Sequence, residues 1–113
     1  MSAPQKCQTP QQAPPALYRL YLANRDGRPF TPAERRSVLR VLKPSASGLG
    51  RGATLLDATG LWAGRALPTL VVHIAGRECT VRGVAERLRR RFGQQAVGLE
   101  RGGSFEIIRG GEP

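Results

Sequence analysis

The chain has 113 residues, the length of one ordinary domain, and 18 basic against eight acidic residues give it a formal charge of +10. No stretch approaches the roughly 18 apolar residues of a membrane span, and the N-terminus lacks the apolar segment of a signal peptide. Two cysteines, Cys7 and Cys79, are too few for a disulfide framework. Composition therefore excludes membrane-spanning and disulfide-rich secreted proteins, and we expect a cytoplasmic protein without membrane contact.

Residues 1–16 hold four prolines and four glutamines and predict a disordered tail, and residues 110–113 predict a second, flexible tail. Between the tails, residues 17–109 predict a single domain. Alternation over residues 17–22 predicts a strand that places Tyr18, Leu20 and Leu22 in the core. The same alternation places Arg19 and Tyr21 on the opposite face of the sheet.

Two amphipathic helices are expected. Thr31 and Glu34 have the spacing of a capping box, with Pro32 at the first helical position, so a helix should begin there and end before Pro44. Thr80 can cap a second helix, whose apolar residues recur at three-or-four spacing and whose outer face is dense in arginine.

Residues 53–58 and 67–75 predict the two strands of a hairpin, joined through the glycine-flanked stretch 59–64. Residues 96–100 and 104–109 predict two further short strands. The order strand, helix, strand, strand, helix, strand, followed by a terminal strand, predicts the α+β class. We expect a ferredoxin-like, split βαβ sandwich, with two helices on one face of an antiparallel sheet and an extra C-terminal hairpin strand.

Few residues could support catalysis or metal binding. The one histidine, two aspartates and two cysteines fall on separate elements. His73 and Asp57 could act across paired strands as a base and its orienting carboxylate, but no serine or cysteine is placed as a nucleophile. Cys7, His73 and Cys79 lack the paired spacing of a structural zinc site. We therefore expect no enzymatic activity, no metal and no cofactor.

Sixteen of the 18 cations are arginine, whose planar guanidinium matches phosphate in a bidentate way. Such a surplus indicates an anionic partner, although GC-rich codon usage would produce the same excess. We expect a compact phosphate-bearing ligand, such as a nucleotide, on the open face of the sheet and its loops. Arginines would meet the phosphate and an aromatic ring would stack on the base; the expected ligand-binding residues are Arg19, Tyr21, Arg51, Trp62, Arg65, His73 and Arg109.

Arg51 belongs to a glycine-rich stretch, residues 48–53, that matches the spacing of a dinucleotide-binding fingerprint. That fingerprint needs a strand before it and a helix after it, whereas here a helix precedes and a strand follows. The stretch is therefore either a loop that wraps an anion with backbone amides or a plain linker.

The positive charge is also consistent with functions other than nucleotide binding. Four arginines on the second helix form the densest positive run, which could bind RNA or DNA or could be a solvated helix face; they are Arg87, Arg89, Arg90 and Arg91. The protein could also inhibit a host defence complex by presenting its basic helices to an acidic surface. Apolar residues on the second face of the sheet additionally predict a homo-oligomer.

Three stretches, 17–22, 53–64 and 91–97, together resemble a family of small phage and bacterial proteins of unknown function. The shared patterns are LYxLYL, TxxDATGxWxG and RFxQxxV, and the likeness rests mainly on residues 57–64. The resemblance implies a compact ferredoxin-like domain found in phage genomes, with no catalytic residues to transfer. It makes phage counter-defence the expected class of function.

Overall fold

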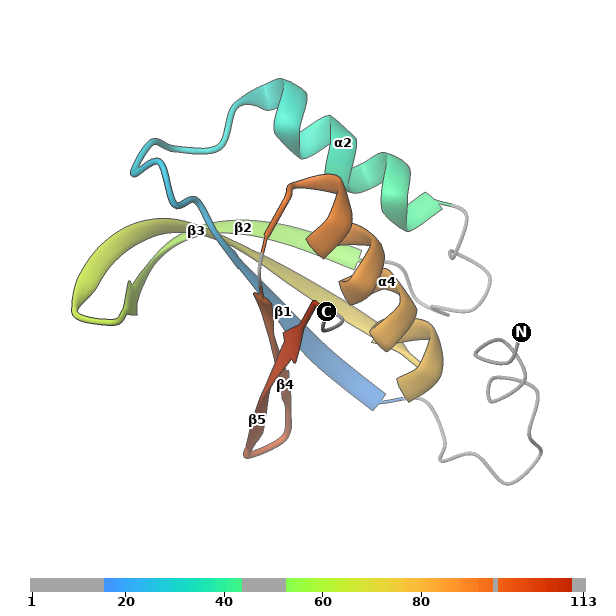
Figure 1. Cartoon of the computed structure of the whole chain (residues 1–113). Coiled ribbons are helices and arrows are strands. Elements are labelled where there is room, and N and C mark those ends of the chain that lie inside the picture. Colours follow the sequence, from blue (N-terminus) through green and yellow to red (C-terminus); the bar gives the residue numbers. More distant parts are fainter. Residues whose placement is uncertain (1–15, 44–52, 95, 111–113) are drawn as a thin grey trace.

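The computed structural model describes residues 16–43, 53–94 and 96–110. All pairs of neighbouring strands in these residues are antiparallel, and the sheet order is β2-β3-β1-β4-β5. Both helices cover the same face of the sheet, and the other face is left open (Figure 1). The elements are β1 (Ala16–Ala23), α2 (Pro32–Leu42), β2 (Ala53–Trp62), β3 (Arg65–Gly76), α4 (Glu78–Arg91), β4 (Ala96–Arg101) and β5 (Ser104–Arg109).

This is the ferredoxin-like fold that the element order predicts. Each helix connects two strands that are not neighbours, α2 from β1 to β2 and α4 from β3 to β4, and β5 adds an edge strand beside β4. The predicted α+β class and sheet are therefore confirmed. Ala16, predicted as the end of a tail, is the first residue of β1, while residues 1–15, 44–52 and 111–113 lie outside the described residues. Within the described residues, no helix has the length and apolar character to cross a membrane.

The core lies between the sheet and the two helices. Leu20 and Leu22 of β1 face this side fully buried, beside Leu70 and Val72 of β3. Each such side chain contributes about 1.5–3 kcal/mol by leaving water. The alternation predicted for β1 is confirmed, and α4 closes the core with its buried residues Val81, Val84, Ala85 and Leu88.

The start of α2 is set locally, as predicted. The backbone amide of Glu34 donates to Thr31 Oγ1 at 3.1 Å, and the Thr31 amide donates to Glu34 Oε1 at 2.8 Å. Helix α4 differs from its prediction, because it begins at Glu78 and not after Thr80, and its N-cap, Arg77, makes no side-chain capping bond. Strand β3 runs to Gly76, so the chain enters α4 directly from the strand.

The hairpin of β2 and β3 is longer than predicted. The expected connection over residues 59–64 shrinks to Ala63 and Gly64, whose φ angles of 51° and 80° are those of a two-residue hairpin turn. Gly60 lies inside β2, and a Cβ there would collide with the indole nitrogen of Trp62. The glycine that suggested a loop instead makes room for a side chain lying flat on the strand.

Candidate functional site

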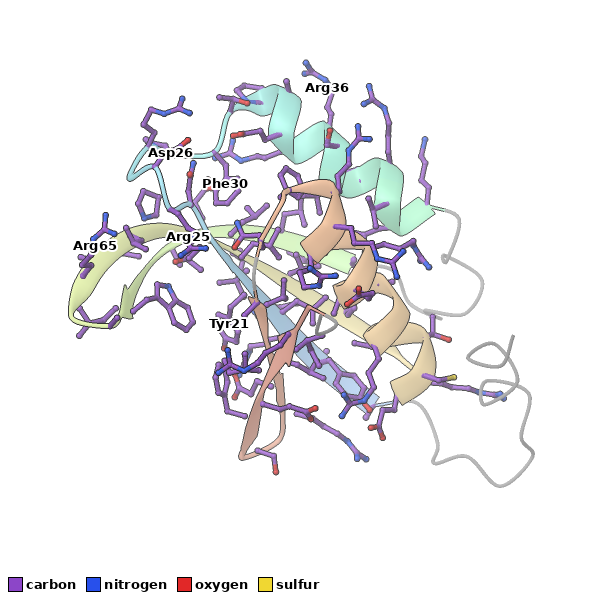
Figure 2. All side chains as sticks on the ribbon, in the orientation of Figure 1. Tyr21, Arg25, Asp26, Phe30, Arg36 and Arg65 are labelled. Atoms are coloured by element: carbon purple, nitrogen blue, oxygen red, sulfur yellow. The ribbon has the colours of Figure 1, made fainter. Side chains whose placement is uncertain are left out.

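The face of the sheet away from the helices brings residues of its three central strands together. In the register, Arg19 of β1 lies between His73 of β3 and Glu100 of β4. Tyr21 lies between Val71 of β3 and Gly98 of β4. Figure 2 labels Tyr21 on the side of the sheet opposite to α2. Because successive strand residues point to opposite faces, these side chains share the open face.

Three rings from three strands meet on this face, and we call Tyr21, Trp62 and Phe105 the aromatic cluster. The ring centroids of Tyr21 and Trp62 lie 6.3 Å apart, and those of Tyr21 and Phe105 lie 5.9 Å apart. The indole nitrogen of Trp62 donates to Thr69 Oγ1 at 3.1 Å, which fixes that ring. Phe105 is 52% exposed, so the cluster presents a ring surface to a ligand.

Glu100 forms hydrogen bonds both to the aromatic cluster and to a cationic side chain. Its Oε2 accepts from the Arg19 guanidinium at 3.0 Å, and its Oε1 accepts from the hydroxyl of Tyr21. These two hydrogen bonds, Tyr21 first and Arg19 second, lower the pKa of the Glu100 carboxyl, and the charge of His73 lowers it further. Burial and then the neighbouring carboxylate raise the pKa of Tyr21. At neutral pH the face therefore holds a carboxylate, a neutral phenol and a guanidinium that is already paired.

A pocket of about 460 Å³ is lined by the paired residues Arg19 and Glu100, and we call it the sheet pocket. Arg101, at the end of β4, also lines it. Because Glu100 also binds Tyr21, the sheet pocket and the aromatic cluster are contiguous. A ligand can therefore stack a flat ring on the cluster and place a polar group in the pocket.

By register and alternation, six of the seven residues predicted to bind a ligand lie on the open face: Arg19, Tyr21, Trp62, Arg65, His73 and Arg109. Arg65 lies at the end of the β2–β3 hairpin, where Figure 2 labels it, and Arg109 lies at the end of β5. Arg51 lies outside the described residues.

Sequence reasoning missed Glu100 and Phe105. The search for an anion-binding site gave no weight to a carboxylate, and the pairing of Glu100 with Arg19 joins residues 81 positions apart. Alternation over β5 could have placed Phe105 on one face, but only the order of the strands shows that this face is shared with Tyr21.

The imagined pair of His73 and Asp57 does not form. Asp57 stands opposite Leu70, on the helix side of the sheet, and binds Arg35 of α2, whereas His73 faces the open side. Among the described residues, no three His, Cys, Asp or Glu side chains are grouped so that they could hold a metal ion.

The arginine run of α4 is partly neutralised. Glu86 accepts from Arg89 and from Arg90, each with an Nε–Oε distance of 3.0 Å. Arg82 instead binds Glu78 in its own helix and Glu106 on β5. Of the four arginines predicted as one positive patch, Arg89 and Arg90 are therefore paired with a carboxylate, which lowers the net charge of the patch.

No family model and no curated protein matches the chain. Among solved structures, a phage S-adenosylmethionine lyase in complex with S-methyl-5′-thioadenosine matches with a TM-score of 0.57 and 16% identity, covering 83% of this chain and 88% of that one. Its apo state matches with a TM-score of 0.55 and 16% identity, covering 85% and 90%. CPII, a nitrogen regulatory PII-like protein from Thiomonas intermedia K12, bound to ADP, AMP and bicarbonate, matches with a TM-score of 0.51 and 15% identity, covering 88% and 97%. At these identities the likeness establishes the fold.

The comparison corrects one sequence-based expectation. We expected no enzymatic activity because titratable groups were few and scattered, and that expectation is wrong, since a lyase has this same fold. Of the groups counted there, His73 lies on the open face, which it shares with Glu100, Tyr21 and Arg19, three residues that the count left out. The resemblance to the family of small phage proteins stays a prediction, because no family model matches.

Proposed function

We propose that the open sheet face binds a small molecule with an adenosine moiety. The aromatic cluster carries this proposal, since it presents partly exposed rings on the one face that the helices leave uncovered. Stacking of a base on an aromatic side chain contributes about 1–3 kcal/mol. The solved structures with this fold support the proposal, because their ligands include S-methyl-5′-thioadenosine, ADP and AMP, which share an adenosine moiety.

The polar end of the ligand would lie in the sheet pocket. Arg19 is already paired with Glu100, so a phosphate there has to compete with a carboxylate, and the Arg101 guanidinium lies over the ring of Tyr18 on the helix side. A neutral or positively charged substituent beside Glu100 meets no such competition. We therefore expect a thionucleoside or a sulfonium nucleoside to bind at least as tightly as AMP, with a phosphate-bearing nucleotide signal as the alternative.

Isothermal titration calorimetry tests the proposal with S-methyl-5′-thioadenosine, S-adenosylmethionine, AMP and ADP. We expect saturable binding of at least one of these ligands, and Phe105→Ala should weaken it about 5- to 140-fold, the loss of about 1–3 kcal/mol of stacking. Leu61→Ala is the matched control, because Leu61 is 74% exposed near the hairpin turn, outside the aromatic cluster. Absence of binding across the panel, or equal losses in both variants, would overturn the proposal.

We also propose that a second copy of the chain completes the site. Ligand pockets bury about 70–90% of a small ligand, whereas an open sheet covers one side of it. The same face exposes Leu17, Leu56 and Ile107 around the aromatic cluster, and this apolar rim is suited to burial against another subunit. Light scattering at several protein concentrations measures this, and a strict monomer with and without ligand contradicts it.

A second candidate function is cleavage of S-adenosylmethionine. Glu100 favours it, because an ionised carboxylate beside aromatic rings suits a sulfonium cation. When the bond between sulfur and the aminobutyrate chain breaks, the bonding electron pair stays on sulfur, and S-methyl-5′-thioadenosine is released. The chain carbon that was bonded to sulfur then forms a new C–O bond with the carboxylate of the same substrate, so no co-reactant is required.

Chromatography of S-adenosylmethionine incubated with the protein tests the lyase candidate. We expect S-methyl-5′-thioadenosine to accumulate above the non-enzymatic background, and Glu100→Gln to abolish the excess. Glu106→Gln removes the same charge from the helix side of β5, where Glu106 binds Arg82, and should leave activity intact. Tight binding without product would reject the lyase and keep the binding proposal.

The biological setting that we propose is phage counter-defence in the cytoplasm of a bacterial host. A protein that captures or consumes a nucleotide signal or a methyl donor would deprive a defence system of it. The phage origin of the S-adenosylmethionine lyase supports this setting. Plating a phage on a host with an active defence system, with wild-type protein or Phe105→Ala expressed in the host, tests it: only the wild type should raise the plaque count.

A further inference from the structure

The outer surface of the helix layer gathers cations from two helices, and we call Arg36, Arg40, Lys43 and Arg91 the basic helix surface. All four are exposed. Positions 36, 40 and 43 recur at four and three residues along α2, so they form one line with steps of about 6 and 4.5 Å. Figure 2 shows Arg36 pointing away from the sheet.

Helix α4 extends this line into a surface. The guanidinium of Arg91 reaches across to Ser37 of α2, with Nη2 at 3.3 Å from Oγ. Arg91 thus lies beside the first half of the α2 row, and the two helices present their charge together. The sequence placed Arg91 in a run on one helix, but the tertiary structure groups it with cations from α2.

The acidic side chains that the structure describes are all engaged elsewhere. Six of them form ion pairs with arginines that do not belong to this surface: Asp26, Asp57, Glu78, Glu86, Glu100 and Glu106. The seventh, Glu34, closes the capping box of α2. The charge of the basic helix surface is therefore directed to solvent or to a partner.

The chemistry of the surface favours a phosphate backbone over an acidic protein. Protein interfaces need apolar or aromatic anchors at their centre. Of the exposed large hydrophobic residues in the described part of the chain, only Leu39 lies on a helix. Three of the four cations are arginine, which binds phosphate through parallel hydrogen bonds.

We propose that the basic helix surface binds the backbone of single-stranded nucleic acid without base specificity. This goes beyond the proposed nucleoside site, which lies on the opposite face of the sheet, so both partners can bind at the same time. Four neutralised phosphates predict that the logarithm of affinity falls with the logarithm of salt with a slope of about −2.8. From 50 to 200 mM NaCl the Kd should therefore rise about 50-fold.

Fluorescence anisotropy with a labelled single-stranded DNA of mixed sequence tests this. We expect a Kd of the order of micromolar at 50 mM NaCl, and Arg36→Gln with Arg40→Gln should reduce the steepness of the salt dependence by about 1.4. The control, Arg65→Gln with Arg109→Gln, removes the same charge from the ends of β3 and β5 and should leave the slope unchanged.

Three results would overturn the proposal: no binding at 50 mM NaCl, equal loss in the control, or equal competition by poly-glutamate. Equal loss in the control would mean that net charge alone attracts the DNA. Equal competition by poly-glutamate would mean that the surface accepts any polyanion, an acidic protein included. Substitutions at exposed positions change stability little, and thermal unfolding of both variants verifies this.

Discussion

Gly98→Ala separates the stability of the open face from its binding function. A Cβ at position 98 would lie 2.8 Å from Cζ and 3.0 Å from Cε1 of Phe105, and 3.4 Å from Cβ of Tyr21. The first two contacts are too short, so the Phe105 ring has to move, and its 52% exposure gives it room to do so. Tyr21 can stay in place. The substitution therefore displaces one ring of the aromatic cluster without touching the core.

The two effects of this displacement have different sizes. Stability loses the Tyr21–Phe105 ring pair, about 0.5–1.5 kcal/mol, and gains about 0.5–1 kcal/mol because alanine replaces glycine in a strand. The net change should stay within about 1 kcal/mol, or about 4–8 °C in Tm. Binding of an adenosine ligand loses the stacked ring, about 1–3 kcal/mol, so the Kd should rise about 5- to 140-fold.

Thermal unfolding by circular dichroism and calorimetry with S-methyl-5′-thioadenosine measure the two effects on the same protein. Gly103→Ala is the control, because a Cβ there meets nothing within 4 Å. If Gly98→Ala binds like the wild type, Phe105 is not part of the binding surface. If it loses several kcal/mol of stability, the ring cannot move and the aromatic cluster is a structural element.

Three further predictions address the charges and the core. Glu100→Gln should lower the pKa of Tyr21, because the carboxylate that raises it is removed; NMR titration of labelled tyrosine measures this, and an unchanged pKa would contradict the hydrogen bond. Two arginines lower the pKa of Glu86 to about 2, so its stabilisation is present above the ordinary value of 4.5 and is lost as pH falls through about 2. Glu86→Gln should therefore reduce the unfolding free energy at pH 7 and not at pH 2, and equal losses at both would refute the ion pairs. Leu88→Ala empties a fully buried position and should cost about 2–5 kcal/mol in urea denaturation, whereas a loss below 1 kcal/mol would place Leu88 outside the core.

The sequence predicted features whose causes are local. Alternation in β1 identified its buried and open faces, and the spacing of Thr31 and Glu34 located the start of α2. The hairpin was misjudged at Gly60, because a glycine signals a turn unless another side chain occupies the space that its Cβ would need. Here that side chain is Trp62, which lies against the strand once β3 supplies Thr69 as its hydrogen-bond partner.

The candidate site was predicted in part for the same reason. Side-chain alternation placed Arg19 and Tyr21 on the open face, and both predictions hold. The prediction of arginines and aromatic rings left out a carboxylate, because the surplus of positive charge suggested an anionic ligand. Pairing of β1 with β4 brings Glu100 against both residues and turns the centre of the face into a carboxylate held among rings.

By itself, then, the sequence determined the elements, the order that selects a ferredoxin-like sheet, and the two faces of β1, since these follow from periodicity, capping and turn chemistry within a few residues. The tertiary structure decided which charges remain for a partner and which rings meet. An ion pair or a ring contact depends on strand pairing across tens of residues. The formal charge depends on composition alone and does not show which charged residues are neighbours in space. The same 18 cations therefore divide into a paired Arg19 beside Glu100 and an outward row on α2, a division that only the folded chain contains.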